Sequence, residues 1–257
     1  MRRALIGYTG FVGSNVDAPG RFDGRFNSKN IETLAGSAFD EIWCAGVNAV
    51  KWWANQNPES DWAQISTLLA ALKSVRANKF FLISTVDVYR DPVAVDEDTP
   101  VSEEGHHAYG AHRLRVERFI AERFADHCII RLPGLYGAGL KKNLIFDVLN
   151  KRPIDGFDAD STFQFYGLDR LWTDAERASK SGCRLINFAV EPLSVRGVVQ
   201  KLTGEGFENH TKAPPVAYDM RTKYGALWGR RDGYMQSANT ALEGIGAYGA
   251  VAQRAGT

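Results

Sequence analysis

The sequence has few cysteines, no long apolar run and almost no net charge. Its 257 residues include 31 Lys or Arg and 30 Asp or Glu, a formal net charge of +1. This balance excludes the basic excess that is typical of nucleic-acid and anionic-membrane proteins. No apolar stretch approaches the roughly 20 residues of a membrane-spanning helix, and the opening apolar stretch is too short for a signal peptide. We therefore expect a cytoplasmic protein without nucleic-acid or membrane partners.

The three cysteines, Cys44, Cys128 and Cys183, are an odd number without metal-ligand spacing. Cys44 and Cys128 lie inside apolar runs, which predicts buried reduced thiols, and we expect no metal site. The 28.4 kDa chain has 44% hydrophobic residues, enough to bury a core without disulfides. The length suits one large domain, or a main domain with a small lobe.

Strand-like and helix-like segments alternate along the chain. Short apolar runs at residues 3–6, 41–45, 79–83, 128–131 and 185–189 predict strands, and residues 25–27 are a weaker strand signal. Helical spacing follows Asn57-Pro58 and recurs from Ala108 to Phe124, and Ser194 and Gly204 have the positions of an N-cap and a C-cap. Alternation of this kind predicts an α/β fold with a doubly wound parallel sheet of the Rossmann type.

The alternation weakens after Gly134, where glycine and loop content rise. We expect a dinucleotide-binding core in residues 1–133, with its sheet completed by about residues 165–205. Residues 134–257 would then form a small substrate lobe interleaved with the core, near the carboxyl ends of the strands, where such sheets bind ligands.

A glycine triplet directly follows the first expected strand and opens a helix: Gly7-Tyr8-Thr9-Gly10-Phe11-Val12-Gly13. Gly7 permits a tight turn, Gly10 lets the backbone approach a pyrophosphate, and Gly13 lets the helix pack closely on the strand. The amino end of the helix offers free N–H groups to the phosphates. The alternative is a purely structural turn.

The remaining motifs come in a recognisable order. They are Ser84-Thr85-Val86-Asp87-Val88-Tyr89, Asp96-Glu97-Asp98-Thr99-Pro100, Tyr109-Gly110-Ala111-His112-Arg113-Leu114 and Arg131-Leu132-Pro133-Gly134-Leu135-Tyr136-Gly137. With the glycine triplet they resemble the NAD-dependent epimerase/dehydratase family, the extended short-chain dehydrogenase/reductases that act on nucleotide sugars. The resemblance covers roughly residues 3–205, and the last fifty residues match nothing useful.

The resemblance implies that Tyr109 is the general acid/base of a hydride transfer. An unperturbed tyrosine, with a pKa near 10, needs a neighbouring cation for this role at neutral pH. Position 113, on the same helix face, is arginine where the family has lysine. Arg113 still supplies charge and can bond ribose hydroxyls, but it cannot give up a proton and has a different shape. The arginine therefore puts turnover in question more than cofactor binding.

The resemblance also places Thr85 at the catalytic Ser/Thr that bonds the reacting oxygen, with Ser84 as the nearby alternative. The family's 4,6-dehydratases have two acidic residues after this threonine. Here Val86 takes the first position and only Asp87 is acidic. We therefore do not expect dehydration.

The acidic residue that binds an NAD ribose at the end of the second strand is missing. Ser28-Lys29 could instead meet a 2′-phosphate, which favours NADP over NAD. Ala45-Gly46, after the third strand, should lie against the centre of the cofactor. The expected cofactor-binding residues are Gly7, Thr9, Gly10, Phe11, Val12, Gly13, Asn27, Ser28, Lys29, Ala45, Gly46, Ser84, Tyr109, Arg113 and Pro133.

Other candidates have weaker support. We interpret His106 and His107 as exposed loop histidines, and Trp52 and Trp53 as core or lid aromatics. Cations for a substrate diphosphate are available at Lys141, Lys142, Arg152 and Arg221, each of which can equally be a solvated surface charge.

Two hypotheses remain open. The first is an NAD(P)-dependent reductase or epimerase acting on a sugar or nucleotide sugar, with Thr85, Tyr109 and Arg113 as catalytic residues. The second is a non-catalytic NAD(P)-binding sensor or structural protein of the same fold. The family often dimerises through the helix of the catalytic tyrosine, so a homodimer is a further expectation.

Overall fold

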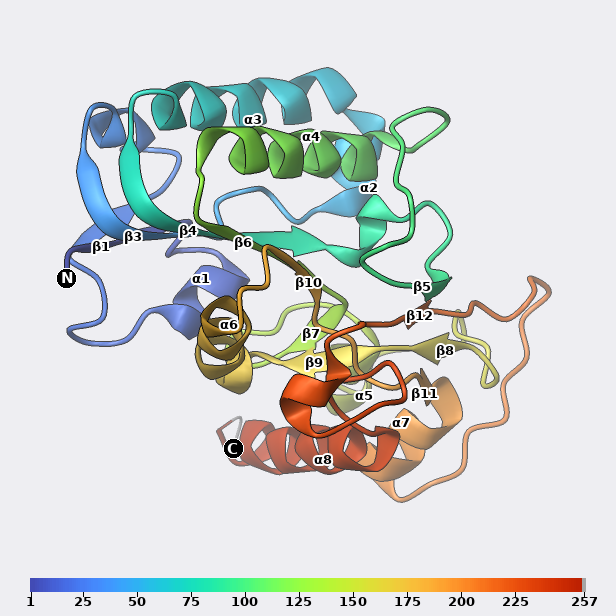
Figure 1. The fold of residues 1–257 in the computed structure, drawn as a ribbon. Coiled ribbons are helices and arrows are strands. Elements are labelled where there is room, and N and C mark those ends of the chain that lie inside the picture. Colours follow the sequence, from blue (N-terminus) through green and yellow to red (C-terminus); the bar gives the residue numbers. More distant parts are fainter. Residues whose placement is uncertain (256–257) are drawn as a thin grey trace. The chain divides into compact units, whose positions relative to one another are not determined.

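A six-stranded sheet forms the centre of the first of two units in the computed structural model, which describes residues 1–255 (Figure 1). Unit 1 comprises residues 1–91, 99–131 and 171–186. The strands follow the order β10-β6-β4-β3-β1-β2 across the sheet. Their bounds are β1 (Arg3–Ile6), β2 (Gly24–Phe26), β3 (Ala38–Cys44), β4 (Arg76–Thr85), β6 (His127–Leu132) and β10 (Leu185–Asn187).

The direction in which strands are added reverses at β1. This strand pairs in parallel with β2 on one side and with β3 on the other, so that Ala4 lies opposite both Gly24 and Ile42. From β3 the chain moves outward through β4, β6 and β10. The carboxyl ends of β1 and β3 therefore mark the switch point, where open α/β sheets bind their ligands.

Helices cover both faces of this sheet. The helices α3 (Pro58–Leu72) and α4 (Ala108–Arg123) lie on one face, and α1 (Phe11–Val16) and α6 (Leu171–Lys180) lie on the other (Figure 1). Successive residues of β4 point to opposite faces. Phe80 stacks on Phe124 at 4.4 Å, and Phe81 stacks on Trp43 at 4.3 Å, which in turn stacks on Trp172 of α6. The predicted doubly wound α/β sheet is confirmed.

Local sequence signals explain where the helices begin and end. Pro58 occupies the first turn of α3, where a missing N–H costs nothing. The Ser194 hydroxyl accepts the Gly197 amide at the start of α7 (Val195–Thr203), and Gly204 ends this helix with a left-handed φ of 78°. Both predicted caps of α7 are confirmed.

Unit 2 comprises residues 92–98, 132–170 and 187–257, and is described here to residue 255. It contains three small two-stranded sheets, which pair β7 with β9, β11 with β8, and β12 with β5. The strands are β5 (Val93–Val95), β7 (Gly134–Tyr136), β8 (Thr162–Phe163), β9 (Phe165–Gly167), β11 (Leu193–Ser194) and β12 (Asp219–Met220). Its other helices are α5 (Leu144–Leu149) and α8 (Ala238–Ala255).

The three cysteines are buried and none is in a disulfide, as the sequence predicts for Cys44 and Cys128. Among the described residues, no helix is long and apolar enough to cross a membrane.

We expect the protein to lose stability as the pH rises above about 9. Burial raises the pKa of Cys44 to about 11 and the pKa of Cys128 to about 12, whereas unfolded thiols ionise near pH 8.5. The folded state then holds more protons than the unfolded state, so each thiol lowers the free energy of unfolding by about 1.4 kcal/mol per pH unit between about pH 9 and 11. Urea unfolding across this range measures the slope. The double variant Cys44→Ala/Cys128→Ala should show a shallower slope, and an identical slope would contradict the argument.

Candidate active site at the carboxyl edge of the sheet

The glycine turn after β1 is closed by contacts that only glycine permits. Gly7 has a φ of +86°, and a Cβ there would lie 2.4 Å from the carbonyl oxygen of Ala45. A Cβ on Gly13 would lie 2.0 Å from the Gly7 carbonyl oxygen. Gly10 is the N-cap of α1 and has no side chain to cap it, so the first amides of the helix remain donors for a ligand. The turn and Ala45-Gly46 meet at the switch point and form a cradle that suits a pyrophosphate.

The end of β2 lies beside this turn, because the Gly7 amide donates to the Phe26 carbonyl oxygen at 2.7 Å. The following residues form a tight loop, in which the Asn27 Oδ1 accepts the Lys29 amide at 2.9 Å. Ser28 and Lys29 are exposed at its tip. The loop thus presents a hydroxyl and an ammonium group, and no carboxylate.

Tyr109 lies in the first turn of α4 and is only 6% exposed. Its amide donates to the Oδ1 of Asn55 at 2.9 Å. Burial raises the pKa of Tyr109, while the Arg113 charge and hydrogen bonding by Thr85 act against this rise. The phenol therefore holds its proton at neutral pH.

Arg113 lies against Tyr109, as the spacing of four residues predicts. Its guanidinium carbon is 3.9 Å from the centre of the Tyr109 ring. The group is 4% exposed and binds Asp61 of α3 in a bidentate manner, Nη1 at 2.6 Å and Nη2 at 3.0 Å. Nη1 also donates to the Tyr109 carbonyl oxygen at 3.3 Å, and Nη2 donates to that of Asn48. The positive charge of Arg113 is thus compensated by a carboxylate that is 1% exposed.

Four of the five N–H donors of Arg113 are engaged by these groups. The fifth, Nε–H, is buried and has no hydrogen-bond partner in the described structure. A buried donor without an acceptor costs free energy, so this group suits a hydroxyl supplied by a ligand. Nε is therefore the atom of Arg113 that remains available for the expected contact with a ribose.

Lys51 and Asp87 form an ion pair close to Tyr109. Lys51 begins α2 (Lys51–Gln56), and its Nζ donates to the Asp87 Oδ1 at 2.6 Å. The Asp87 amide donates to the Thr85 Oγ1 at 3.1 Å, and this hydroxyl lies 3.4 Å from the Asp87 Oδ2. The Lys51 and Asp87 charges act on the pKa of Tyr109 in opposite directions. Thr85 thus links Tyr109 to a charged pair.

Ser84 is bonded differently from Thr85. Its hydroxyl donates to the Glu117 Oε1 at 2.5 Å. Arg131 binds the same carboxylate at 2.6 Å and donates to the Tyr89 hydroxyl at 2.7 Å. These four side chains are buried and form one network between β4, α4 and β6. The Ser84 hydroxyl is thus engaged within the protein, and the site role of Ser84 stays a prediction.

The two histidines before α4 are half-buried, so our interpretation of them as exposed loop residues is wrong. The His106 Nε2 contacts the Val88 carbonyl oxygen at 3.1 Å, and the His107 Nδ1 accepts the Gly110 amide at 2.9 Å and caps the helix. Burial and the Lys51 charge lower the pKa of His107. The His107 ring is 6.4 Å from that of Tyr109, so this histidine is part of the site's surroundings.

Unit 2 contains the remaining candidates. Pro133 follows β6 in the chain and belongs to this unit. Arg221 binds Asp219 at 2.6 Å, and the Arg152 guanidinium lies 4.7 Å from the Phe146 ring centre. Their proposed diphosphate contacts remain untested predictions.

Unit 2 contains three residues that could ligate a metal, and bonds within the protein explain why they lie together. Asp158, Asp160 and His210 have ligand atoms within 4.8 Å of one another. Asp158 accepts the amides of Thr211 and Asp160, which lower its pKa, and Asp160 binds Arg196 at 2.8 Å. These contacts account for the cluster without an ion.

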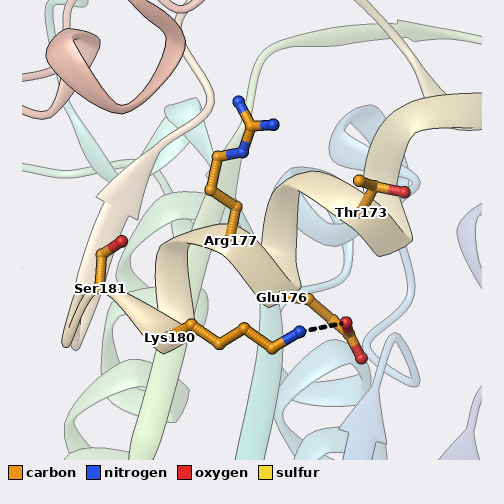
Figure 2. Close-up of a pocket in the computed structure, with 5 residues that line it drawn as sticks. All are labelled: Thr173, Glu176, Arg177, Lys180 and Ser181. Carbon is orange, nitrogen blue, oxygen red and sulfur yellow. Dashed lines mark hydrogen bonds and ion pairs between the residues drawn. The ribbon is translucent and has the colours of Figure 1, made fainter.

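A shallow depression of about 340 Å³ lies on the exposed surface of α6 (Figure 2). Five residues of this helix and the turn after it line the depression, and Lys180 binds Glu176 at 2.9 Å. None of the residues expected at the site lines it. The depression therefore carries no argument for function. The five residues are Thr173, Glu176, Arg177, Lys180 and Ser181.

Sequence reasoning missed Asp61, Lys51 and Asn55. A signal for Asp61 exists, because it extends the apolar stripe of Ile65, Leu68, Leu69 and Leu72 by one turn. A carboxylate on a buried face predicts a buried cationic partner. Lys51 and Asn55 lie on a short helix without such a pattern and have no comparable signal.

The doubly wound sheet, with a glycine cradle at its switch point, defines a dinucleotide-binding protein. The model of the NAD dependent epimerase/dehydratase family matches residues 24–152, a range that includes Thr85, Tyr109 and Arg113 and begins after the glycine turn. The chain therefore belongs to the NAD-dependent epimerase/dehydratase family. No sequence match was found among curated proteins.

Solved structures share the fold over nearly the whole chain. A dTDP-4-dehydrorhamnose reductase from Clostridium acetobutylicum is 15% identical with a TM-score of 0.73, and the match covers 98% of this chain and 100% of that one. WbmG from Bordetella bronchiseptica, in complex with NAD and UDP, is 14% identical with a TM-score of 0.76 and coverages of 98% and 95%. RMD from Pseudomonas aeruginosa, complexed with NADPH, is 16% identical with a TM-score of 0.71 and coverages of 97% and 99%.

Family membership makes this chain an NAD(P)-dependent enzyme. The expectations of the family, of an enzyme and of a nicotinamide cofactor are confirmed, and the preference for NADP over NAD stays a prediction. The residues also fit such a group, because the glycine turn leaves a cradle that a Cβ would fill and the Arg113 Nε is a buried donor without an acceptor.

Proposed function

We propose that this protein reduces a carbonyl group of a nucleotide sugar, or epimerises such a sugar through the same step, with Tyr109 as the general acid/base. The observation that carries the proposal is the buried Tyr109 phenol beside Thr85 and Arg113, on the edge that also holds the glycine cradle. The solved relatives support the substrate class, since one is a dTDP-4-dehydrorhamnose reductase and another binds UDP.

The protonation of Tyr109 favours the reductive direction. The raised pKa keeps the phenol protonated at neutral pH, so it can donate a proton to a carbonyl oxygen that becomes a hydroxyl. The nicotinamide, when bound, supplies the hydride. Thr85 orients the reacting oxygen by a second hydrogen bond. Epimerisation needs the phenolate first, which is the less favoured state here.

Arg113 acts on the cofactor through a single atom. Its Nε–H is available to a ribose hydroxyl, while the other four donors hold Asp61, Asn48 and the helix backbone. Arg113 therefore fixes the Tyr109 ring and contributes one ribose contact. A proton relay through position 113 is not available, because arginine stays protonated.

We expect a preference for NADPH that depends on Lys29. The exposed Ser28-Lys29 tip supplies a cation for a 2′-phosphate. Lys29→Glu should weaken NADPH binding about tenfold or more, because a charge-assisted bond is replaced by repulsion. NADH binding should be retained or improved, since a carboxylate at this position can accept ribose hydroxyls. Fluorescence titration of both nucleotides measures the change. Lys73→Glu, an equal charge change at the exposed end of α3, is the control, and equal losses in both variants would contradict the assignment.

The proposed function is tested on protein whose absorbance shows that no nucleotide is bound. NADPH and NADH are titrated first, and nucleotide sugars that carry a 4-keto or 6-deoxy-4-keto group are then screened for nucleotide oxidation. Binding with turnover supports the proposal. Binding without turnover across the screen would count against this reaction and this substrate class, and no binding of either nucleotide would overturn the proposal altogether.

A further inference from the structure

The segment between β3 and α3 holds the Tyr109 site at three points. The Asn48 carbonyl oxygen accepts from Arg113, Lys51 binds Asp87 at 2.6 Å, and the Asn55 Oδ1 accepts the Tyr109 amide at 2.9 Å. A helix of six residues, such as α2, is not stable by itself in water. These contacts therefore place α2, and Lys51 with it, in a defined position beside Tyr109.

The two cations near Tyr109 differ in their surroundings. Arg113 is 4% exposed, and its guanidinium is bound on one edge by the Asp61 carboxylate. The Lys51 side chain is 41% exposed, and its partner Asp87 bonds Thr85 through its own amide. Arg113 is bound by Asp61, whereas Lys51 is bound by Asp87. Removing Lys51 would therefore leave the Asp87 carboxylate, near Thr85 and Tyr109, without its ion-pair partner.

We infer that Lys51 is a positioning residue of the proposed reaction, which acts through Asp87 and Thr85 to set the orientation and the proton affinity of Tyr109. The inference rests on the proposed function. Lys51 holds the Asp87 carboxylate at its Oδ1, and the Asp87 amide in turn holds the Thr85 hydroxyl. The Thr85 oxygen then faces the Tyr109 phenol in one orientation.

The charged and titratable groups around Tyr109 come from four elements. They are Arg113 and the N-cap His107 on α4, Asp87 after β4, Lys51 on α2, and Asp61 on α3 behind Arg113. Of these, Lys51 and Arg113 favour the phenolate, and Asp87 opposes it. Removal of Lys51 should therefore raise the proton affinity of Tyr109, and removal of the Asp87 charge should lower it.

The test follows the Tyr109 phenol directly by NMR of protein labelled with ¹³C at the tyrosine ζ carbon. Tyr109→Phe identifies the signal. We expect Tyr109 to titrate about half a pH unit or more higher in Lys51→Met than in the parent protein. In Asp87→Asn, Tyr109 should titrate at a lower pH than in the parent. Lys51→Arg should restore the parent curve, and Lys51→Met/Asp87→Asn should return toward it. Lys73→Met is the matched control.

Turnover gives a second readout. Lys51→Met should lower kcat about tenfold or more, because Thr85 and the Tyr109 phenol lose their fixed orientation and the phenol becomes a weaker acid. NADPH affinity should stay within about twofold of the parent, and Lys51→Arg should recover most of the loss. A Tyr109 titration that is unchanged in Lys51→Met would overturn the inference. Equal losses of kcat in Lys51→Met and Lys51→Arg, without a change in the Tyr109 titration, would overturn it as well. The NMR result does not need turnover, so a failure of the proposed function is seen separately.

Discussion

Tyr109→Phe should lower kcat by about 10²–10⁴-fold, the usual contribution of a general acid. The change removes only the hydroxyl. The ring that lies 3.9 Å from the Arg113 guanidinium carbon remains, as does the backbone amide that donates to Asn55. NADPH affinity should therefore stay within about twofold of the parent value. Steady-state oxidation of NADPH with a substrate found in the screen, together with a binding titration, checks both statements.

Tyr248→Phe on α8 is the control for loss of a phenol elsewhere, and it should leave kcat unchanged. If Tyr109→Phe keeps most of its turnover, Tyr109 is not the proton donor. If the variant loses NADPH binding together with turnover, the hydroxyl serves the cofactor, and the assignment of a chemical role fails.

Asp61→Asn should destabilise the protein by about 3–5 kcal/mol, the usual cost of leaving one member of a buried ion pair without its partner. Asp61 is 1% exposed and accepts two bonds from Arg113 and one from His112, whose Nδ1 lies 2.7 Å away. Without the carboxylate charge, the Arg113 guanidinium stays buried and uncompensated. Urea unfolding measures the loss.

The double variant Asp61→Asn/Arg113→Met should lose less stability than the sum of the two single variants, because it removes both charges. Glu103→Gln is the matched control on the surface. Glu103 binds Arg115 and Arg118, whose side chains are 44% and 50% exposed, so its loss should cost about 0–1 kcal/mol per pair. Equal losses of stability in Asp61→Asn and Glu103→Gln would contradict the argument that the buried Arg113 charge depends on Asp61.

Substitution of Asp61 should also affect catalysis. Since Asp61 fixes the guanidinium that lies against the Tyr109 ring, any folded Asp61 variant should have a lower kcat than the parent. The two sets of measurements, on stability and on turnover, then report on the same contact.

The sequence by itself determined the elements and the first half of the site. Apolar runs and helical spacing indicate the strands and helices of unit 1, because burial on a sheet or on one helix face imposes those periods. The glycine turn can be predicted because Gly7 and Gly13 meet steric demands that arise within a few residues or at the neighbouring strand. Tyr109 and Arg113 can be paired because four residues make about one helical turn.

Only the tertiary structure decided what surrounds that pair. Asp61 reaches Arg113 across 52 positions of sequence, and Lys51 reaches Asp87 across 36. Nothing in local periodicity specifies such partners, since they depend on which helices the sheet brings side by side. The bonding of Ser84 to Glu117 and the burial of His106 and His107 have the same origin. A charged side chain obtains its function from its neighbours in space, and these are set by packing.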